Sequence, residues 1–145
     1  MTQPERGSAL LETVLLGLIL LMPVIWAVGV LADLHRGALA STAAAREAGF
    51  DAARASSAAD ARRAVDVAVA RAFRDHGLDP ADASIEWSAP SDLNRGGQVE
   101  VRISYSVPVA QAPFIGRVGG PSINVRARHV ARIDPYRSRG VEPVP

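Results

Sequence analysis

The longest apolar run of the chain covers residues 13–32, which hold no charged side chain. At about 1.5 Å per residue, a helix over this run is about 30 Å long, which matches the hydrocarbon core of a bilayer. We therefore predict a transmembrane helix over 13–32, preceded by a leader-like segment over 1–12. Pro23 removes one backbone donor, and Gly17 and Gly29 leave flat places where another helix can approach, so these three are candidate helix-packing residues.

Alanine dominates the next part of the chain, and we predict that residues 33–77 form an alanine-rich helical region. The first part, 33–54, has no proline and is expected to continue the apolar helix. Its small residues make a thin face that suits close packing, either against other helices or against the strands that follow. A weak stripe joins Leu34, Ala38, Ala45, Ala48 and Phe50, and a four-residue repeat joins Ala40, Ala44 and Ala48; a GC-rich coding bias explains the repeat equally well.

A second helix is predicted to begin after Ser57, whose hydroxyl can cap it, with Asp60 placed three residues later to favour the helix dipole. Apolar residues recur every fourth position in this segment, at Val65, Val69 and Phe73. The helix is expected to end near His76, because glycine and then proline follow.

Beyond residue 80 the period changes from about 3.6 to 2, which is typical of strands. We predict strands over 84–88, 99–107 and 123–132; in the second, apolar residues alternate strictly with polar ones. The connections over 90–97 and 108–121 are rich in proline and glycine, and the second carries Phe114 and Ile115. The pattern predicts an α+β fold with a small three-stranded antiparallel sheet within 83–134, followed by a flexible tail over 135–145.

Composition excludes several function classes. The 145 residues carry 16 Lys and Arg against 15 Asp and Glu, so the net charge of +1 disfavours a nucleic-acid partner. The chain has no cysteine, which removes disulfides, thiol catalysis and cysteine metal sites. The three histidines, His35, His76 and His129, stand far apart and outside any metal-ligand spacing, and no G-x-S-x-G motif occurs. We expect no enzyme activity, no metal and no cofactor.

The edge of the apolar run carries the most informative motif, R-G-S-A-L-L-E over residues 6–12. A carboxylate at the end of a membrane helix is costly, so Glu12 calls for compensation. The motif resembles the class III signal of type IV pilins and pseudopilins, which implies cleavage by a prepilin peptidase between Gly7 and Ser8. Glu12 is then the fifth residue of the mature chain, and the resemblance implies that it neutralises a new N-terminal ammonium during assembly. The alternative is a headgroup-level charge before an ordinary anchor helix.

Taken with the alanine-rich helix and the strands V-E-V-R-I-S-Y-S-V-P-V and I-N-V-R-A-R-H-V-A-R-I, this signal resembles TadE-like proteins of the Tad (Flp) pilus system. The resemblance implies a pilin-like fold and a minor pilin or pseudopilin that takes part in pilus assembly. It implies other pilin-like subunits, the Tad secretion machinery, membrane lipid and a prepilin peptidase as partners. It also implies a single pass through the cytoplasmic membrane, with the N-terminus in the cytoplasm. Thr13 follows Glu12 where processed members usually have an aromatic, and an uncleaved chain would be a permanent bitopic assembly factor.

Two other interpretations remain open. An A-x-A site at residues 38–40 is compatible with a secretory signal peptide and a released protein. The third strand aligns Arg126, Arg128 and Arg132 on one side, either as a solvated face or as a surface for an anionic ligand or protein partner. Flanking charges alone weakly favour the opposite membrane orientation, since more arginines follow the apolar run than precede it.

Overall fold

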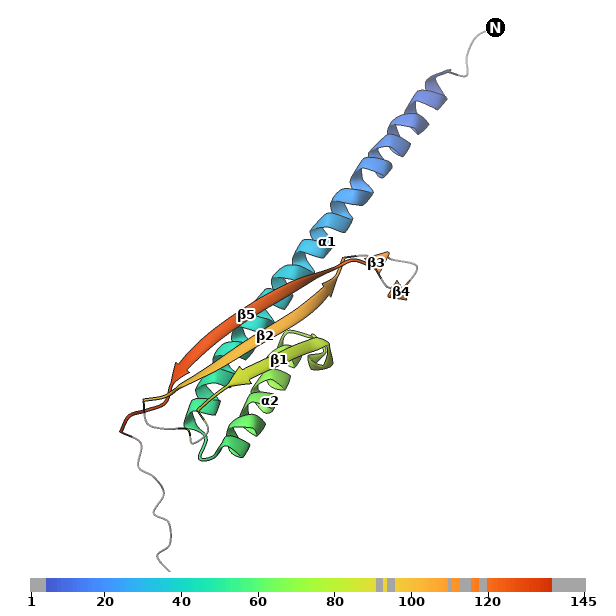
Figure 1. Ribbon diagram of the computed structural model, residues 1–145. Helices are drawn as coiled ribbons and strands as arrows, with labels where there is room; N and C mark the ends of the chain where they lie inside the picture. The colour runs from blue at the N-terminus through green and yellow to red at the C-terminus, as the bar shows by residue number, and fades with distance from the viewer. Residues whose placement is uncertain are drawn as a thin grey trace, which may run out of the picture. The chain divides into compact units, whose positions relative to one another are not determined.

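A computed structural model describes residues 5–90, 93, 96–109, 111–112, 116–117 and 120–136. The elements follow the order α1 (Glu5–Arg54), α2 (Ala58–Asp75), η1 (Pro80–Asp82), β1 (Ala83–Ser88), β2 (Gln98–Pro108), β3 (Gln111–Ala112), β4 (Gly116–Arg117) and β5 (Ser122–Arg132). The chain divides into two compact units, Met1–Asp33 and Leu34–Pro145. The predicted α+β class is confirmed: a long apolar helix, a second helix and a three-stranded antiparallel sheet follow in that order (Figure 1).

The first unit contains the apolar part of α1. The helix begins at Glu5 and includes the whole run over residues 13–32 that was predicted to span the membrane. Residues 5–12 contain no proline and only one glycine, so nothing in their backbone prevents helix formation. Pro23 lies inside the helix, and α1 continues without interruption through the alanine-rich segment to Arg54, as predicted.

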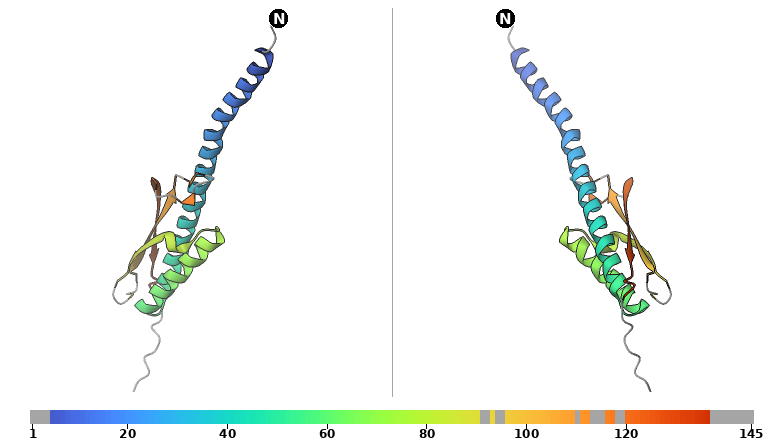
Figure 2. Two further views of the ribbon diagram at one scale, coloured as in Figure 1. Left: turned by 90° about the vertical axis from the view of Figure 1, so that its right-hand side faces the viewer. Right: turned by 90° about the vertical axis from the view of Figure 1, so that its left-hand side faces the viewer.

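The second unit has two layers, with helices covering one face of the sheet (Figure 2). The strand order is β1-β2-β5, and both pairings are antiparallel. The central strand β2 alternates between buried and more exposed residues along its whole length. Its apolar side chains form the inner face, and its polar side chains form the outer face together with Glu86 of β1 and Arg126 and Arg128 of β5.

The helical layer approaches the sheet closely because its buried face consists of small residues. Ala40, Ala44 and Ala48 are fully buried, and two glycines of the same segment lie against β2 and β5. A Cβ added to Gly37 would lie 3.1 Å from Tyr105 Cδ1, and one added to Gly49 would lie 2.8 Å from His129 Cδ2. The four-residue repeat of alanine therefore belongs to the core of the unit.

The prediction that Phe50 shares one helix face with the alanine residues of α1 is wrong. Ala45 and Ala48 are buried, but Phe50 is 43 % exposed. At 100° per residue, Phe50 points about 160° away from Ala48, so the two cannot share one helix face. The Phe50 ring packs instead at the side of the helix against His129, with 5.2 Å between ring centroids.

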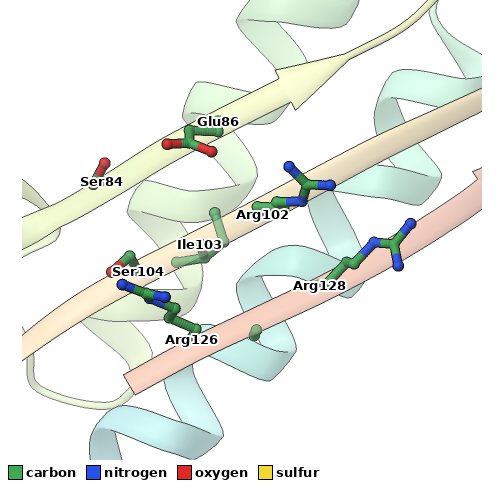
Figure 3. A pocket seen from close by; sticks show the side chains of 8 residues that line it. Ser84, Glu86, Arg102, Ile103, Ser104, Arg126 and Arg128 are labelled. Atoms are coloured by element: carbon green, nitrogen blue, oxygen red, sulfur yellow. The ribbon is translucent and has the colours of Figure 1, made fainter. Parts of the chain in front are cut away.

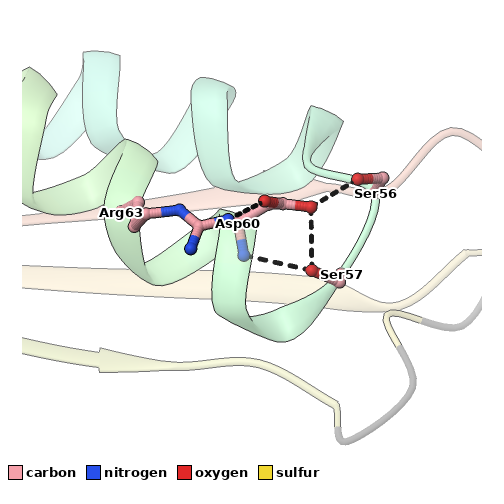
Figure 4. Close-up of polar contacts among 4 residues, drawn as sticks. All are labelled: Ser56, Ser57, Asp60 and Arg63. Atoms are coloured by element: carbon pink, nitrogen blue, oxygen red, sulfur yellow. Dashed lines mark hydrogen bonds and ion pairs between the residues drawn. The ribbon is translucent and has the colours of Figure 1, made fainter.

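The second helix matches its prediction closely. Ser57 is the N-cap, and its hydroxyl accepts a hydrogen bond of 3.1 Å from the Asp60 backbone N–H (Figure 4). Val65, Val69 and Phe73 are buried, and Phe73 packs on Tyr105 of β2 with 5.3 Å between ring centroids. An ion pair of 3.1 Å between Arg71 and Glu47 joins α2 to α1 at the surface.

The connections differ from their predictions in detail. The β2–β5 connection, expected to be irregular, contains a short antiparallel pairing of β3 with β4. Phe114 and Ile115 lie outside the described residues, as do residues 137–145 of the predicted tail and residues 91–92 and 94–95 of the predicted turn. In that turn Gly96 has a φ of 76°, a conformation that glycine adopts freely, and Leu93 is buried in the core.

Candidate functional site

The predicted processing site lies within the first turns of α1. Gly7, Ser8 and Glu12 all fall in the helix that begins at Glu5. Ser8 and Glu12 are four residues apart, which is about one turn of an α-helix. A chain that began at Ser8 would therefore carry its amino group one turn from the Glu12 carboxylate.

The helix that follows exposes its apolar side chains. Fifteen large apolar side chains between Leu10 and Leu31 are 46–73 % exposed, and Leu20 is the most exposed of them. Within the described part of the chain, this is the one helix long and apolar enough to cross a membrane, with a mean hydropathy of 2.7. Exposed apolar side chains are unfavourable in water, so lipid or neighbouring apolar helices would stabilise this segment.

The candidate helix-packing residues face open space. Apart from the adjoining residues and the backbone of α1 itself, no atom of the described residues lies within 4 Å of a Cβ added to Gly17 or Gly29. Both positions therefore remain available to a neighbouring helix, and Pro23 lies midway between them in α1.

The second candidate site is the outer face of the sheet. The register places Arg102 of β2 directly opposite Arg128 of β5, and Ser104 directly opposite Arg126. On the neighbouring strand β1, Glu86 lies directly opposite Arg102, and Ser84 lies directly opposite Ser104. Three arginines from two strands are thus gathered on adjacent rows of one face.

Glu100 holds two of these arginines. Its carboxylate accepts hydrogen bonds from Arg128 Nε at 2.7 Å and Arg128 Nη2 at 3.0 Å, and Arg102 Nη2 lies 2.6 Å from Oε1. The hydrogen bonds from Arg128 lower the pKa of Glu100, with the charge of Arg102 adding to the effect, and Glu100 in turn raises the pKa of Arg128. Glu100 and Arg128 are therefore both ionised across the neutral range.

A depression of about 570 Å³ lies over this part of the sheet (Figure 3). Its polar lining consists of Ser84, Glu86, Arg102, Ser104, Arg126 and Arg128. Among the described residues, Arg126 has no hydrogen bond or ion pair, so its guanidinium is the free cation of the group. Of the three arginines predicted to share a surface, Arg126 and Arg128 line the depression, whereas Arg132 lies on the same strand outside it.

Sequence reasoning missed the contribution of β1 and β2 to this face. Arg102 and Glu86 stand in clearly alternating strands, so their outward direction was readable from the pattern. Their position beside Arg126 and Arg128 depends on the register between strands far apart in the sequence, which the pattern does not supply.

The histidines lie in separate places. His35 is exposed on α1, and His76 Nδ1 lies 2.8 Å from the Ala72 carbonyl oxygen at the end of α2. His129 lies on the inner face of the sheet, and its buried Nε2 has no hydrogen-bond partner among the residues that the structure describes. No cluster of three or more His, Asp or Glu side chains suited to a metal ion occurs in the part of the chain that the structure describes.

Comparisons with models of protein families, with curated proteins and with solved structures found no match to this chain. The site is therefore interpreted from its own geometry and chemistry.

Proposed function

We propose that the chain is a membrane-anchored, pilin-like subunit, a minor pilin or pseudopilin that takes part in assembly of a Tad (Flp) pilus. The apolar part of α1 lies in the cytoplasmic membrane, with the N-terminus in the cytoplasm and the α+β unit outside. Its partners are other pilin-like subunits, the Tad secretion machinery and membrane lipid, and a prepilin peptidase processes the chain.

The observation that carries the proposal is the exposed apolar helix with one carboxylate at its N-terminal edge. The side chains over residues 13–32 are uncharged and exposed, which suits both lipid and neighbouring apolar helices. An assembly role accounts for Glu12 better than simple anchoring does, because anchoring gives no reason for an acid there. Cleavage after Gly7 would place a new ammonium one helical turn from this acid, where the two charges compensate each other.

The packing of α1 disfavours release by a secretory signal peptidase. The A-x-A site at residues 38–40 lies inside the helix, and Ala40 and Ser41 are fully buried. Cleavage there would separate α1 within the core of the α+β unit. An anchored chain keeps that core intact.

Mass spectrometry of the protein purified from membranes tests the processing step. We expect a chain that begins at Ser8, with or without an N-methyl group. A chain that begins at Met1 contradicts the cleavage and leaves an uncleaved anchor. A chain that begins near Ser41 contradicts the whole proposal, since it identifies a released protein.

Substitution of Glu12 tests the assembly role. We expect Glu12→Ala to leave membrane insertion unchanged, because it removes a charge from the edge of the apolar run. Pilus assembly, counted by electron microscopy in the native host, should fall at least tenfold. The matched control is Asp66→Ala, which removes an exposed acid from α2 and should leave pilus number unchanged. Normal pilus number in Glu12→Ala would contradict the role assigned to Glu12.

A further inference from the structure

The outer face of the sheet places two like charges directly opposite each other, which does not favour the stability of the sheet. Arg102 and Arg128 stand directly opposite each other, and like charges in opposed positions destabilise an antiparallel pair. Glu100 relieves this repulsion by binding both guanidinium groups. The carboxylate also restrains the two side chains, so they are held beside the depression.

The depression carries an excess of positive charge. Arg102, Arg126 and Arg128 are balanced by only two acids, Glu86 and Glu100. Because Glu100 already binds Arg102 and Arg128, the uncompensated charge is centred on Arg126. Arg126 and Ser104 occupy opposed positions on neighbouring strands, and their side chains lie together in Figure 3. The guanidinium and the hydroxyl are both hydrogen-bond donors suited to one oxyanion.

The size of the depression shows that an isolated anion would not fill it. Its volume of about 570 Å³ falls in the range of pockets that hold small organic ligands, about 300–1,000 Å³. Ser84 and Glu86 of β1 line the side away from β5, and they offer hydroxyl and carboxylate oxygens. Carboxylate oxygens accept hydrogen bonds from sugar or polyol hydroxyls, and the serine hydroxyls both donate and accept.

We propose that this depression binds a phosphorylated polyol or sugar. The phosphate lies against Arg126 and Ser104, with Arg102 and Arg128 adding positive potential, and the hydroxyl groups of the ligand face Ser84 and Glu86. This activity goes beyond a role in pilus assembly, and binding is measurable in the absence of any pilus.

Titration of the full-length protein in zwitterionic nanodiscs tests the proposal. The probes are glycerol 3-phosphate, inorganic phosphate and glycerol. Isothermal titration calorimetry at low ionic strength measures the binding of each probe. We expect glycerol 3-phosphate to bind more tightly than inorganic phosphate, and glycerol to show no binding. Failure of glycerol 3-phosphate to bind at 10 mM, on the order of the weakest specific affinities, would overturn the proposal.

Two matched variants separate a built site from general attraction. Arg126→Gln should weaken glycerol 3-phosphate binding at least tenfold, since it removes the free cation. Arg132→Gln removes the same charge from the same strand outside the depression, so it should change the affinity less than twofold. Equal weakening by both variants would overturn the proposal, because diffuse electrostatic attraction would then suffice.

The phosphate can come from a lipid headgroup or from a soluble compound, and one further arm distinguishes these sources. The titration is repeated in nanodiscs that contain phosphatidylglycerol. A lower apparent affinity for glycerol 3-phosphate identifies the headgroup as a competitor for the depression, whereas an unchanged affinity identifies a soluble ligand. A lower affinity and an unchanged affinity each support the site only if Arg126→Gln abolishes the binding of glycerol 3-phosphate and, where it competes, of the headgroup.

Discussion

At the residue scale, glycine and alanine set the distance between α1 and the sheet. Gly49 lies under His129, and Gly37 lies under Tyr105, so neither position has room for an unadjusted Cβ. The His129 ring also packs on Phe50, which limits its freedom to move aside. These glycines therefore serve packing, although glycine in a helix interior costs about 1 kcal/mol relative to alanine.

Gly49→Ala tests this close approach. The new Cβ would lie 2.8 Å from His129 Cδ2, and overpacking typically costs about 1–3 kcal/mol. This cost exceeds the gain of about 1 kcal/mol in helix propensity, so we expect net destabilisation of up to about 2 kcal/mol. Thermal unfolding of the full chain in detergent, followed by circular dichroism, should show a Tm lowered by several degrees. The matched control Gly29→Ala has open space and should not lower the Tm; a higher Tm in Gly49→Ala would show that the contact is not tight.

At the element scale, the start of α2 depends on a local network of hydrogen bonds. Ser56 and Ser57 donate their hydroxyls to Asp60 Oδ2, and Arg63 donates to Oδ1 (Figure 4). These bonds, with Ser56 the largest contributor, lower the pKa of Asp60 from 3.8 to about 2. The carboxylate also lies in the first turn, where it favours the helix dipole.

The lowered pKa predicts a pH-dependent contribution to stability. Asp60 binds fewer protons in the folded chain than in the unfolded one, so its contribution is present above about pH 4 and is lost as the pH falls towards 2. We expect Asp60→Asn to be less stable than the original chain at pH 7, with the difference narrowing as the pH approaches 2. Denaturant unfolding at both pH values measures this. Asp66→Asn removes an acid elsewhere on α2, and an equal loss at pH 7 in that variant would attribute the effect to net charge instead of the cap.

The N-cap itself makes a separate prediction. Ser57→Ala removes the acceptor for the Asp60 N–H and one donor to its carboxylate. Loss of an N-cap serine typically costs about 1 kcal/mol, so the free energy of unfolding should fall by that amount at pH 7 and the denaturant midpoint should fall with it. Ser122→Ala provides the comparison. It changes an exposed side chain at the first residue of β5 and should change the midpoint little. An unchanged midpoint in Ser57→Ala would show that the cap does not stabilise α2.

At the scale of the whole molecule, the two units have opposite solvent requirements. The unit Leu34–Pro145 buries its apolar side chains between helices and sheet, whereas the apolar side chains of the first unit are exposed. An aqueous environment suits the former and penalises the latter. This contrast within one chain is the basis of the proposed membrane anchor.

A charged substitution in the middle of the apolar run tests the anchor. Arginine near the centre of a membrane helix costs about 2.5–3.5 kcal/mol on insertion scales, so Leu20→Arg should lower the inserted fraction substantially. Carbonate extraction of membranes, followed by immunoblotting, measures that fraction. Val67→Arg places the same charge at an exposed position of α2, and it should leave insertion unchanged. Full insertion of Leu20→Arg would contradict a span over residues 13–32.

Local patterns in the sequence determined most of the elements. The uncharged run, the Ser57 cap, the four-residue repeat in α2 and the alternation of β2 each depend on residues close in the chain, and their predictions agree with the structure. The β3–β4 pairing was missed because two-residue strands leave no detectable period.

Only the tertiary structure decided which residues from distant segments meet. The small-residue segment of α1 was predicted to pack against either helices or strands, and the packed unit places β2 against Gly37 and β5 against Gly49. The register of the three strands places the arginines of β5 beside Glu100 and Arg102 of β2 and near Glu86 of β1. The physical reason is that periodicity states which way a side chain points along one element, whereas proximity between elements follows from packing them into one core.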